Sequence, residues 1–410
     1  MLTHTLSSKT QEYLDLEDQY GAHNYFPIPV VLERGDGVFL WDVDGKRYYD
    51  FLSGYSALNQ GHCHPRIINK LIEQAQKLTL TSRAFFNDQM GIYAKYITEL
   101  FGYDKVLPMN SGAEAVETAV KLTRRWGYAV KGIPDNEAKI IVCEKNFHGR
   151  TTTIVSFSSD PSACTQFGPL TPGFEIIPYN DLVALEKALQ DKNVAGFLVE
   201  PIQGEAGVFV PDDGYLKGVR ELCTEYNVLM VADEIQTGLA RTGKMLACDH
   251  ENVRADVVIL GKALSGGTIP VSAVLADDEI MLGIKPGQHG STYGGNPLAC
   301  AVAIEALQVL KDEQMAENAE VMGELMRSEL RKLNSPFIKL VRGKGLLNAI
   351  VIDHSNPQAA WELCLRLKEN GLLAKPTHGD KIRFAPPLII TREQVLDCVD
   401  IINQSLKVFE

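Results

Sequence analysis

From about residue 100 onward, short apolar runs alternate with longer segments in which apolar residues recur every three or four positions. The short runs include VAGFLVEP, NVLMVADE, DVVILG and VSAVLA, and AEAVETAVKLTRRWGYAV is one of the longer segments. This alternation predicts strands joined by helices, because the two elements have different periods. VLMVA and VVIL are apolar without alternation, which is typical of strands covered by helices on both faces. We therefore predict an α/β fold with a mostly parallel sheet.

The pattern changes toward the C-terminus. Asn296 followed by Pro297 predicts a helix start, with a capping residue and a first-turn proline, and helical spacing continues in pieces to about Leu333. Beyond it, FIKLVRGKGLLNAIVI and KIRFAPPLII predict strands, and AAWELCLRLKENG predicts a helix that ends at Gly371. This part of the chain is expected to form a smaller α+β unit.

Near the N-terminus, GVFLWDVDGKRYYDF predicts a β-hairpin with its turn at Asp44 and Gly45. We expect this hairpin to join the C-terminal unit. The expected organisation is an N-terminal segment, 1–55, that contributes to a small domain, a large domain over 56–310, and a C-terminal small domain over 311–410.

Composition narrows the classes of partner. The 410 residues carry a formal net charge of −12, which disfavours nucleic acid and anionic membrane surfaces. No apolar run approaches the roughly 20 residues that cross a bilayer, and the first residues lack a signal or transit pattern. We expect a cytoplasmic protein, or a mitochondrial matrix protein if a transit peptide has been removed. Eight cysteines without a C-x-x-C pair are expected to be reduced.

Three predicted strands end in charged residues, namely Glu200, Asp233 and Lys262. For any one of them, a charge at the solvated tip of a strand is the ordinary explanation. Together, Asp233 and Lys262 indicate a functional site, because ligands of α/β sheets bind beyond the carboxyl ends of the strands. A partly desolvated lysine, turning out of its strand at Gly261, is a credible Schiff-base nucleophile, and a carboxylate could keep a pyridine nitrogen protonated. Pyridoxal phosphate chemistry requires these two groups.

A phosphate site is predicted where a strand turns into a helix at Ser111, Gly112, Ala113 and Glu114. Backbone N–H groups and the helix dipole could bind a phosphate there. The same residues form a capping box, which is a purely structural device, and the two interpretations are compatible.

Two other motifs resemble known binding motifs in part. GLARTGKM, residues 238–245, fits G-x-x-x-x-G-K but has Met245 where the P-loop has Ser or Thr, so we interpret it as a chance resemblance. GHCHP places His62, Cys63 and His64 together without distant partners, and a structural loop is favoured over a metal site. No metal is expected.

The runs VADEIQTGLARTG, GKALSGGTIPVSAV, HGSTYGGNPLA, VEPIQGEAGV and MNSGAEAVETA resemble the class III aminotransferases, which are pyridoxal phosphate enzymes of fold type I. The resemblance runs from about Tyr20 to the end of the chain. It implies a seven-stranded, mostly parallel sheet in a large domain and a smaller α+β domain. It also implies a homodimer with shared active sites.

The resemblance implies roles at the cofactor. Lys262 carries the cofactor aldehyde as a Schiff base and then moves the proton, Asp233 pairs with the pyridinium nitrogen, and Phe147 stacks on the ring. Thr292 reaches the phosphate from the neighbouring subunit. The residues expected to bind pyridoxal 5'-phosphate are Ser111, Gly112, Ala113, Phe147, Glu200, Asp233, Gln236, Lys262, Ser291 and Thr292.

Within the class, YGAHNYFPIPVVLERG, NQGHCHP, LTSRAFFND and NGLLAKPTHGDKIRFAPPL are similar to the ornithine aminotransferases. That similarity implies L-ornithine and 2-oxoglutarate as substrates. Arg383 binds the α-carboxylate of 2-oxoglutarate and is neutralised by Glu205 when ornithine is bound, while Arg150 holds the distal carboxylate. Tyr25 and Tyr55 orient ornithine. Acetylornithine and 4-aminobutyrate aminotransferases of the same class are the alternatives.

Overall fold

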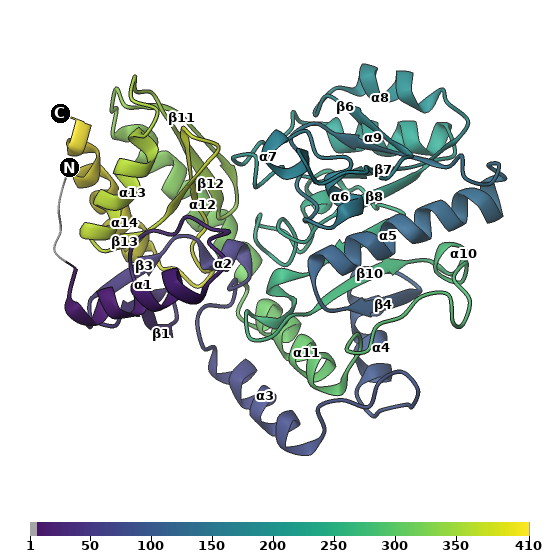
Figure 1. Cartoon of the computed structure of the whole chain (residues 1–410), viewed down its shortest axis with the longest axis horizontal. Helices are drawn as coiled ribbons and strands as arrows, with labels where there is room; N and C mark the ends of the chain where they lie inside the picture. Colours follow the sequence, from purple (N-terminus) through teal and green to yellow (C-terminus); the bar gives the residue numbers. More distant parts are fainter. Residues whose placement is uncertain (1–5, 410) are drawn as a thin grey trace.

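A seven-stranded sheet forms the centre of the larger part of the molecule (Figure 1). The computed structural model describes residues 6–409. The strand order is β4-β10-β9-β8-β7-β5-β6, and only β10 runs antiparallel to its neighbours. The predicted mostly parallel sheet is thereby confirmed. Its strands are β4 (Lys105–Met109), β5 (Lys139–Cys143), β6 (Phe174–Ile177), β7 (Val194–Val199), β8 (Leu229–Asp233), β9 (Val257–Leu260) and β10 (Ser272–Ala276).

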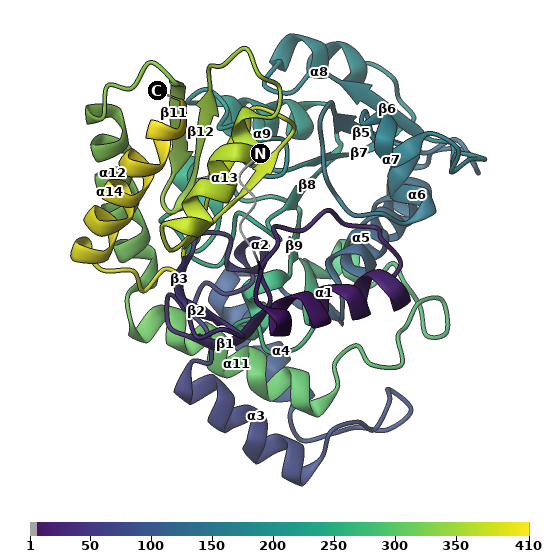
Figure 2. The ribbon, with the colours of Figure 1, turned by 60° about the vertical axis from the view of Figure 1, so that its left-hand side comes forward.

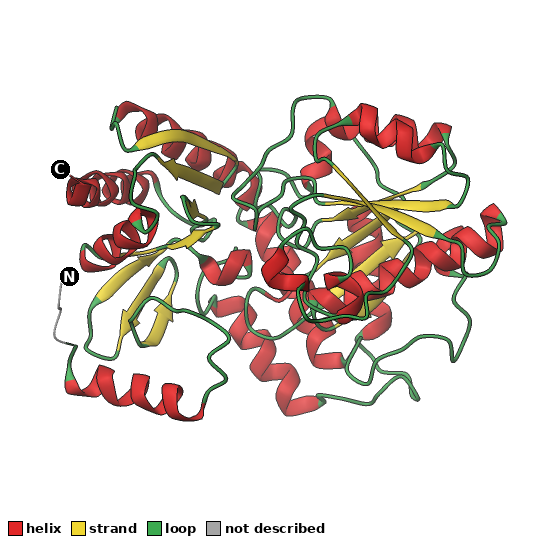
Figure 3. Cartoon of the chain, turned by 45° about the horizontal axis from the view of Figure 1, so that its top comes forward, coloured by secondary structure: helices red, strands yellow, loops and turns green. Residues whose placement is uncertain are grey.

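Helices cover both faces of this sheet (Figure 3). In β9, Val257 and Ile259 face the cluster that contains α5, whereas Val258 and Leu260 pack into the larger cluster on the opposite face. All four side chains are buried, which explains why the strand is apolar at every position. The helices around this sheet are α3 (Pro65–Lys77), α4 (Met90–Phe101), α5 (Gly112–Trp126), α8 (Leu182–Leu189), α9 (Tyr215–Glu225) and α11 (Pro297–Asp312).

The C-terminal part of the chain builds a second, antiparallel sheet of order β11-β12-β15-β14, which we call the C-terminal sheet. Three helices accompany it (Figure 2). Its elements are α12 (Met315–Lys332), β11 (Ile338–Lys344), β12 (Leu347–Ile352), α13 (Ala359–Glu369), β14 (Lys375–Thr377), β15 (Lys381–Phe384) and α14 (Arg392–Leu406).

The N-terminal hairpin lies beside this C-terminal part. Strands β1, β2 and β3 are antiparallel, and β3 pairs in parallel with β13 from the other end of the chain. Gly45, in the turn between β2 and β3, has a φ of 83°, as a tight hairpin requires. The elements are α1 (Ser8–Tyr20), β1 (Leu32–Asp36), β2 (Phe39–Asp42), β3 (Arg47–Asp50) and β13 (Leu372–Leu373).

The predicted helix start at Asn296 is confirmed, but the helix is interrupted. The Asn296 side chain accepts a hydrogen bond from the Ala299 amide at 2.8 Å, and Pro297 opens the first turn. The chain leaves the helix after Asp312 and adopts a φ of 50° at Gln314 before α12 begins. A left-handed residue cannot continue a right-handed helix, so the region expected as one long helix in pieces becomes two helices.

Short elements connect these layers. None of the helices between residues 6 and 409 is long and apolar enough to cross a membrane. The short elements are α2 (Ser53–Ser56), η1 (Gly127–Lys131), α6 (Thr152–Val155), α7 (Pro161–Cys164), η2 (Ala247–Glu251), η3 (Lys262–Ser265), α10 (Asp278–Met281) and η4 (Lys407–Phe409).

Candidate active site

Three charged side chains meet where the adjacent parallel strands β7, β8 and β9 end. Glu200 follows β7, Asp233 ends β8, and Lys262 is the second residue after β9. Because carboxyl ends of parallel strands lie at the same edge of a sheet, the three residues converge there. They line one cavity of about 320 Å³, which we call the inner cavity.

The inner cavity also gathers most of the other residues expected to bind cofactor or substrate. Ser111, Ser291, Thr292 and Arg383 do not line it. The expected residues that line it are Tyr25, Tyr55, Gly112, Ala113, Phe147, Arg150, Glu200, Glu205, Asp233, Gln236 and Lys262.

The carboxylate of Asp233 is held by a histidine. Nδ1 of His148 lies 2.6 Å from Oδ2 of Asp233, and the Ile235 amide donates to Oδ1 at 3.1 Å. Burial by itself lowers the pKa of His148, but the hydrogen bond and charge of Asp233 raise it above its usual value. His148 was not among the predicted site residues. The only signal was its place in NFHGR, between Phe147 and Arg150.

Lys262 adopts a left-handed backbone conformation. Its φ is 46°, whereas Gly261 is extended with a φ of −172°. The expectation that Gly261 makes the turn is therefore wrong, and the lysine itself carries the unusual dihedral. A non-glycine residue in this region costs about 1 kcal/mol or more, and such residues cluster at functional sites. Burial lowers the pKa of the Lys262 ammonium, and the charge of Asp233 partly offsets that effect.

Glu200 is the third titratable side chain at the sheet edge. Burial raises the pKa of its carboxyl from 4.5 to about 8. One oxygen accepts a hydrogen bond from the Phe147 amide at 3.0 Å, which ties the loop after β5 to the end of β7. The Phe147 ring is thereby placed at the cavity wall.

The start of α5 supplies a candidate phosphate site. Ser111 accepts from the Glu114 amide at 3.2 Å, and the Glu114 carboxylate accepts from the Ser111 amide at 2.8 Å, so the predicted capping box is present. Gly112 and Ala113 line the inner cavity with the first turn of the helix. A β-carbon at Gly112 would lie 3.1 Å from the Ile235 side chain, so the absence of a side chain keeps this approach open.

Ser291 and Thr292 lie outside the inner cavity. The Ser291 hydroxyl accepts a hydrogen bond from the Asn110 amide group at 2.9 Å, beside the start of α5. Thr292 is exposed on the surface of this chain.

Glu205, at the wall of the inner cavity, forms an ion pair with Arg383. Nη1 of Arg383 lies 3.0 Å from Oε2 of Glu205, and the guanidinium carbon is 5.2 Å from the centre of the Tyr55 ring. Arg383 itself is only 2 % exposed and stands behind Glu205 rather than at the cavity wall. Its Nε is buried and lacks a hydrogen-bond partner among the described residues. Glu205 occupies Nη1 of Arg383, so an anion that is to bind this atom has to displace Glu205.

The aromatic residues come from two other segments. Tyr55 lies in a left-handed turn, with a φ of 62°, and Gly54 before it has a φ of 56°. The Gln236 side chain donates to the Tyr55 carbonyl at 3.3 Å and so ties this turn to the end of β8. Tyr25 reaches the cavity from the segment between α1 and β1. The guanidinium carbon of Arg150 lies 5.6 Å from the centre of the Phe147 ring.

The GLARTGKM segment is packed in the interior and does not form a phosphate loop. Arg241 is fully buried, and its guanidinium donates to the Asn59 side chain and to the carbonyls of Leu346 and Pro386. These hydrogen bonds join the segment to other parts of the interior, which agrees with the interpretation of the motif as a chance resemblance.

These residues fit pyridoxal phosphate. The inner cavity holds a buried lysine for the aldehyde, a buried carboxylate for a pyridinium nitrogen, and a helix start for a phosphate. The His148 Nε2 atom is buried without a hydrogen-bond partner among the described residues, on the ring that supports Asp233. The cavity thus offers an aromatic side chain, Phe147, for the ring of the cofactor and a helix start, at Gly112 and Ala113, for its phosphate.

Comparison with known proteins points to the same chemistry. The profile of class-III aminotransferases matches residues 20–406. The chain is 64% identical over 401 residues to rat mitochondrial ornithine aminotransferase, covering 98% of this chain and 91% of that protein. It is 52% identical, with a TM-score of 0.95, to an ornithine aminotransferase structure from Toxoplasma gondii that has pyridoxal phosphate at partial occupancy in its active site. That match covers 97% of this chain and 94% of the other.

One similar structure carries a different substrate name. The acetylornithine aminotransferase structure from Elizabethkingia anophelis is 60% identical, with a TM-score of 0.90, and the match covers 98% of this chain and 99% of the other. Sequence identity and TM-score thus distinguish poorly between the two substrate classes. The distinction depends on the side chains of the cavity. With a profile match over nearly the whole length, this chain belongs to the class-III aminotransferases.

Proposed function

We propose that this protein is a pyridoxal phosphate-dependent ornithine δ-aminotransferase. It transfers the δ-amino group of L-ornithine to 2-oxoglutarate and forms glutamate 5-semialdehyde and glutamate in two alternating half-reactions. The observation that carries this proposal is the ion pair of Arg383 with Glu205 beside the Tyr55 ring.

Pyridoxal phosphate supplies the electron sink that stabilises negative charge on the substrate carbon. Lys262 is the residue that would hold the cofactor aldehyde and afterwards carry a proton to and from the reacting carbon, since burial lowers its pKa. Asp233, supported by His148, would accept the ring N–H. Phe147 would stack on the ring, and Gly112 and Ala113 would donate their amides to the phosphate.

The Arg383–Glu205 pair explains how one cavity could accept two unlike substrates. The side chain of ornithine brings an amine to the reacting position, and a free guanidinium there would repel it. The ion pair with Glu205 would neutralise Arg383 while ornithine is bound. The α-carboxylate of 2-oxoglutarate would displace Glu205 and form a bidentate pair with Arg383, which a planar guanidinium favours. Arg150 would then bind the distal carboxylate.

Acetylornithine aminotransferase activity is the second candidate, because the Elizabethkingia anophelis relative carries that name. The two amino donors differ at the α-amino group, which is charged in ornithine and acylated in the other. Tyr55 is half-buried and its pKa is raised by burial and by the charge of Glu205, so it remains a neutral hydroxyl beside an anionic carboxylate. A charged α-ammonium group fits this environment better than an amide.

The deciding experiment is a half-reaction with the holoenzyme. L-Ornithine alone should convert the absorbance of the bound cofactor from its aldehyde form to its amine form, faster than N-acetylornithine or 4-aminobutyrate. If N-acetylornithine or 4-aminobutyrate is the faster donor, that sister activity replaces the proposed one.

The proposed enzyme is a homodimer with shared active sites. The exposed position of Thr292, outside its own chain's cavity, supports a role in the site of a second copy. A dimer mass by light scattering together with weaker cofactor binding in Thr292→Ala would agree with this arrangement. A monomer with full cofactor affinity would contradict it.

A further inference from the structure

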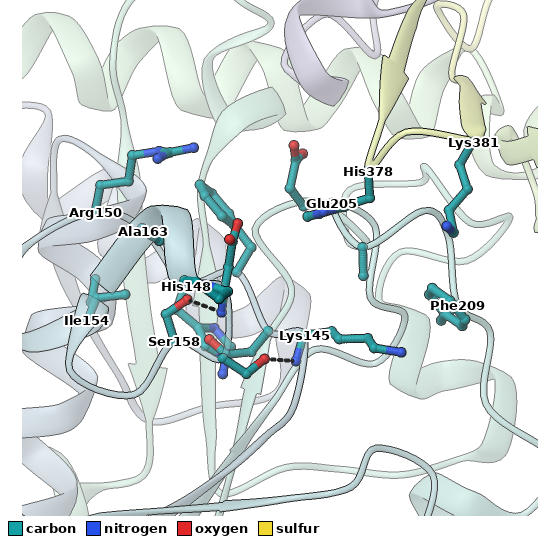
Figure 4. Close-up of a pocket in the computed structure, with 17 residues that line it drawn as sticks. Lys145, His148, Arg150, Ile154, Ser158, Ala163, Glu205, Phe209, His378 and Lys381 are labelled. Atoms are coloured by element: carbon teal, nitrogen blue, oxygen red, sulfur yellow. Dashed lines mark hydrogen bonds between the residues drawn. The ribbon is translucent and has the colours of Figure 1, made fainter. Parts of the chain in front are cut away.

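A second cavity of about 320 Å³ opens beside the inner cavity (Figure 4). We call it the outer cavity. The residues that line both cavities are Phe147, His148, Gly149, Arg150 and Glu205, so the two spaces are continuous there. Its volume falls at the lower end of the range for small-molecule pockets, roughly 300–1,000 Å³. Lys145, Phe209, His378 and Lys381, which also line it, have no role at the inner cavity.

The walls of the outer cavity come from two parts of the fold. Lys145 and the α7 residues Pro161 and Ala163 belong to the part built on the seven-stranded sheet. His378 and Lys381 come from the C-terminal sheet, in and after the turn between β14 and β15. Anything that reaches the inner cavity by this route passes between the two parts.

Positive charge gathers around this cavity. The Lys145 ammonium lies 5.5 Å from the centre of the Phe209 ring, and the Arg342 guanidinium carbon lies 3.8 Å from it. The stem of Lys381 passes over Gly207, where a β-carbon would collide with it. In Figure 4 the ends of Lys145 and Lys381 both lie beside Phe209.

Two carboxylates near the outer cavity are paired with cations, whereas Asp160 forms no ion pair within residues 6–409 and keeps its negative charge. Glu205 pairs with Arg383, and Asp380 pairs with Lys381. Asp160 caps the start of α7 by accepting from the Ser162 amide at 2.9 Å.

The cations, in contrast, are only partly compensated. Among residues 6–409, no ion pair involves Lys145, Arg150 or Arg342. Arg342 is instead fixed by donating twice to the Gly207 carbonyl, at 2.9 and 2.6 Å. The outer cavity is therefore a locally basic region in a chain of net charge −12.

We propose that the outer cavity is an anion-binding vestibule in which Lys145 and Lys381 collect the dicarboxylate amino acceptor before it enters the inner cavity. A cleft lined by one sign of charge concentrates ligands of the opposite sign and raises their association rate. Every cation along this path attracts a dicarboxylate, whereas an amino donor that enters with its ammonium group first is not attracted. The vestibule thus favours the acceptor half-reaction selectively.

This inference rests on the proposed function, and the experiment separates the two. Holoenzyme is prepared with pyridoxamine 5'-phosphate, which needs no amino donor, and its reaction with 2-oxoglutarate is followed by stopped-flow absorbance over a range of salt concentrations. The variant Lys145→Met/Lys381→Met removes both charges at nearly constant side-chain length. Lys187→Met, at an exposed position of α8, is the matched control.

In low salt, the double variant should lose about fivefold or more of the second-order rate constant for 2-oxoglutarate, and the rate should depend less on salt. The reaction of the aldehyde-form enzyme with L-ornithine should stay within about twofold, and Lys145→Arg/Lys381→Arg should restore the acceptor rate. The control should match the parent enzyme.

An unchanged acceptor rate in the double variant, or an equal loss in both half-reactions, would overturn the vestibule. An arginine variant as slow as the methionine variant would overturn it too, because charge is then not the cause. Failure of ornithine to react with the parent enzyme would overturn the proposed function alone, since the acceptor measurement does not depend on the donor.

Discussion

Nδ1 of His148 lies 2.6 Å from the carboxylate of Asp233, with both side chains buried at the edge of the seven-stranded sheet. A carboxylate can only accept a hydrogen bond when ionised, so Nδ1 carries the proton in this pair. The hydrogen bond therefore holds the Asp233 carboxylate in place at the wall of the inner cavity, where a pyridinium nitrogen would need its partner.

Replacing His148 by Phe should weaken both the cofactor site and the fold. Loss of a hydrogen bond to a buried charged group costs about 1–3 kcal/mol, which corresponds to roughly a tenfold or greater loss of pyridoxal phosphate affinity and of kcat. His148→Asn offers a donor at a similar place and should lose less. Equilibrium cofactor binding and unfolding of the cofactor-free protein measure the two effects. Equal values for Phe and Asn variants would show that the hydrogen bond is unimportant.

Lys262→Ala should abolish transamination. A proton-transferring side chain contributes roughly 10²–10⁴-fold, so turnover should fall by at least about a hundredfold. The yellow colour of the bound cofactor should also be lost. Lys244→Ala, which alters the exposed lysine of GLARTGKM, should retain both activity and colour. A severe loss in Lys244→Ala, with ATP binding by the parent protein, would instead revive the nucleotide interpretation.

Glu205→Gln should change which amino donors are accepted. The substitution keeps the shape but leaves the Arg383 charge without its anion at 3.0 Å. We expect kcat/KM for ornithine to fall about tenfold, corresponding to about 1.4 kcal/mol, and L-glutamate to become a better donor. Arg383→Met should show the reverse pattern, with 2-oxoglutarate affected most. Steady-state kinetics with each donor test this, and a uniform loss for all substrates would contradict the switching role.

Tyr55→Phe should raise the KM of ornithine by up to about tenfold, since a hydrogen bond typically contributes about 0.5–1.5 kcal/mol. The ring and its contact with the Arg383 guanidinium remain in this variant. N-Acetylornithine should respond less, because it lacks the α-ammonium group. If both donors lose equally, the Tyr55 hydroxyl does not distinguish them.

Glu200 should make the stability of the cofactor-free protein depend on pH. Its pKa is raised from 4.5 to about 8 by burial, so between these values the folded protein holds a proton that the unfolded chain has released. The free energy of unfolding should therefore decrease as pH rises through this window and level off above it. Urea unfolding at about pH 5 and about pH 9 should show a smaller decrease in Glu200→Gln than in the parent, by on the order of a few kcal/mol.

Much of the fold and the centre of the site could be predicted from local sequence. Apolar runs without alternation indicated strands covered on both faces, and the charges after β7, β8 and β9 indicated the ligand-binding edge. Capping signals at Ser111 and Asn296 located two helix starts. These features are legible because hydrophobic periodicity and backbone capping depend on residues near one another in the chain.

Other features could be decided only by the tertiary structure. His148 and Asp233 are 85 residues apart, and Glu205 and Arg383 are 178 apart, so their contacts depend on how loops pack around the ordered strands. The break at Gln314 and the left-handed backbone of Lys262 follow from packing as well, because neither residue type by itself favours a positive φ. The charge of the outer cavity arises where two sheets approach each other. The sequence by itself determined which side chains follow each strand, and the packing of distant segments determined which of these side chains meet.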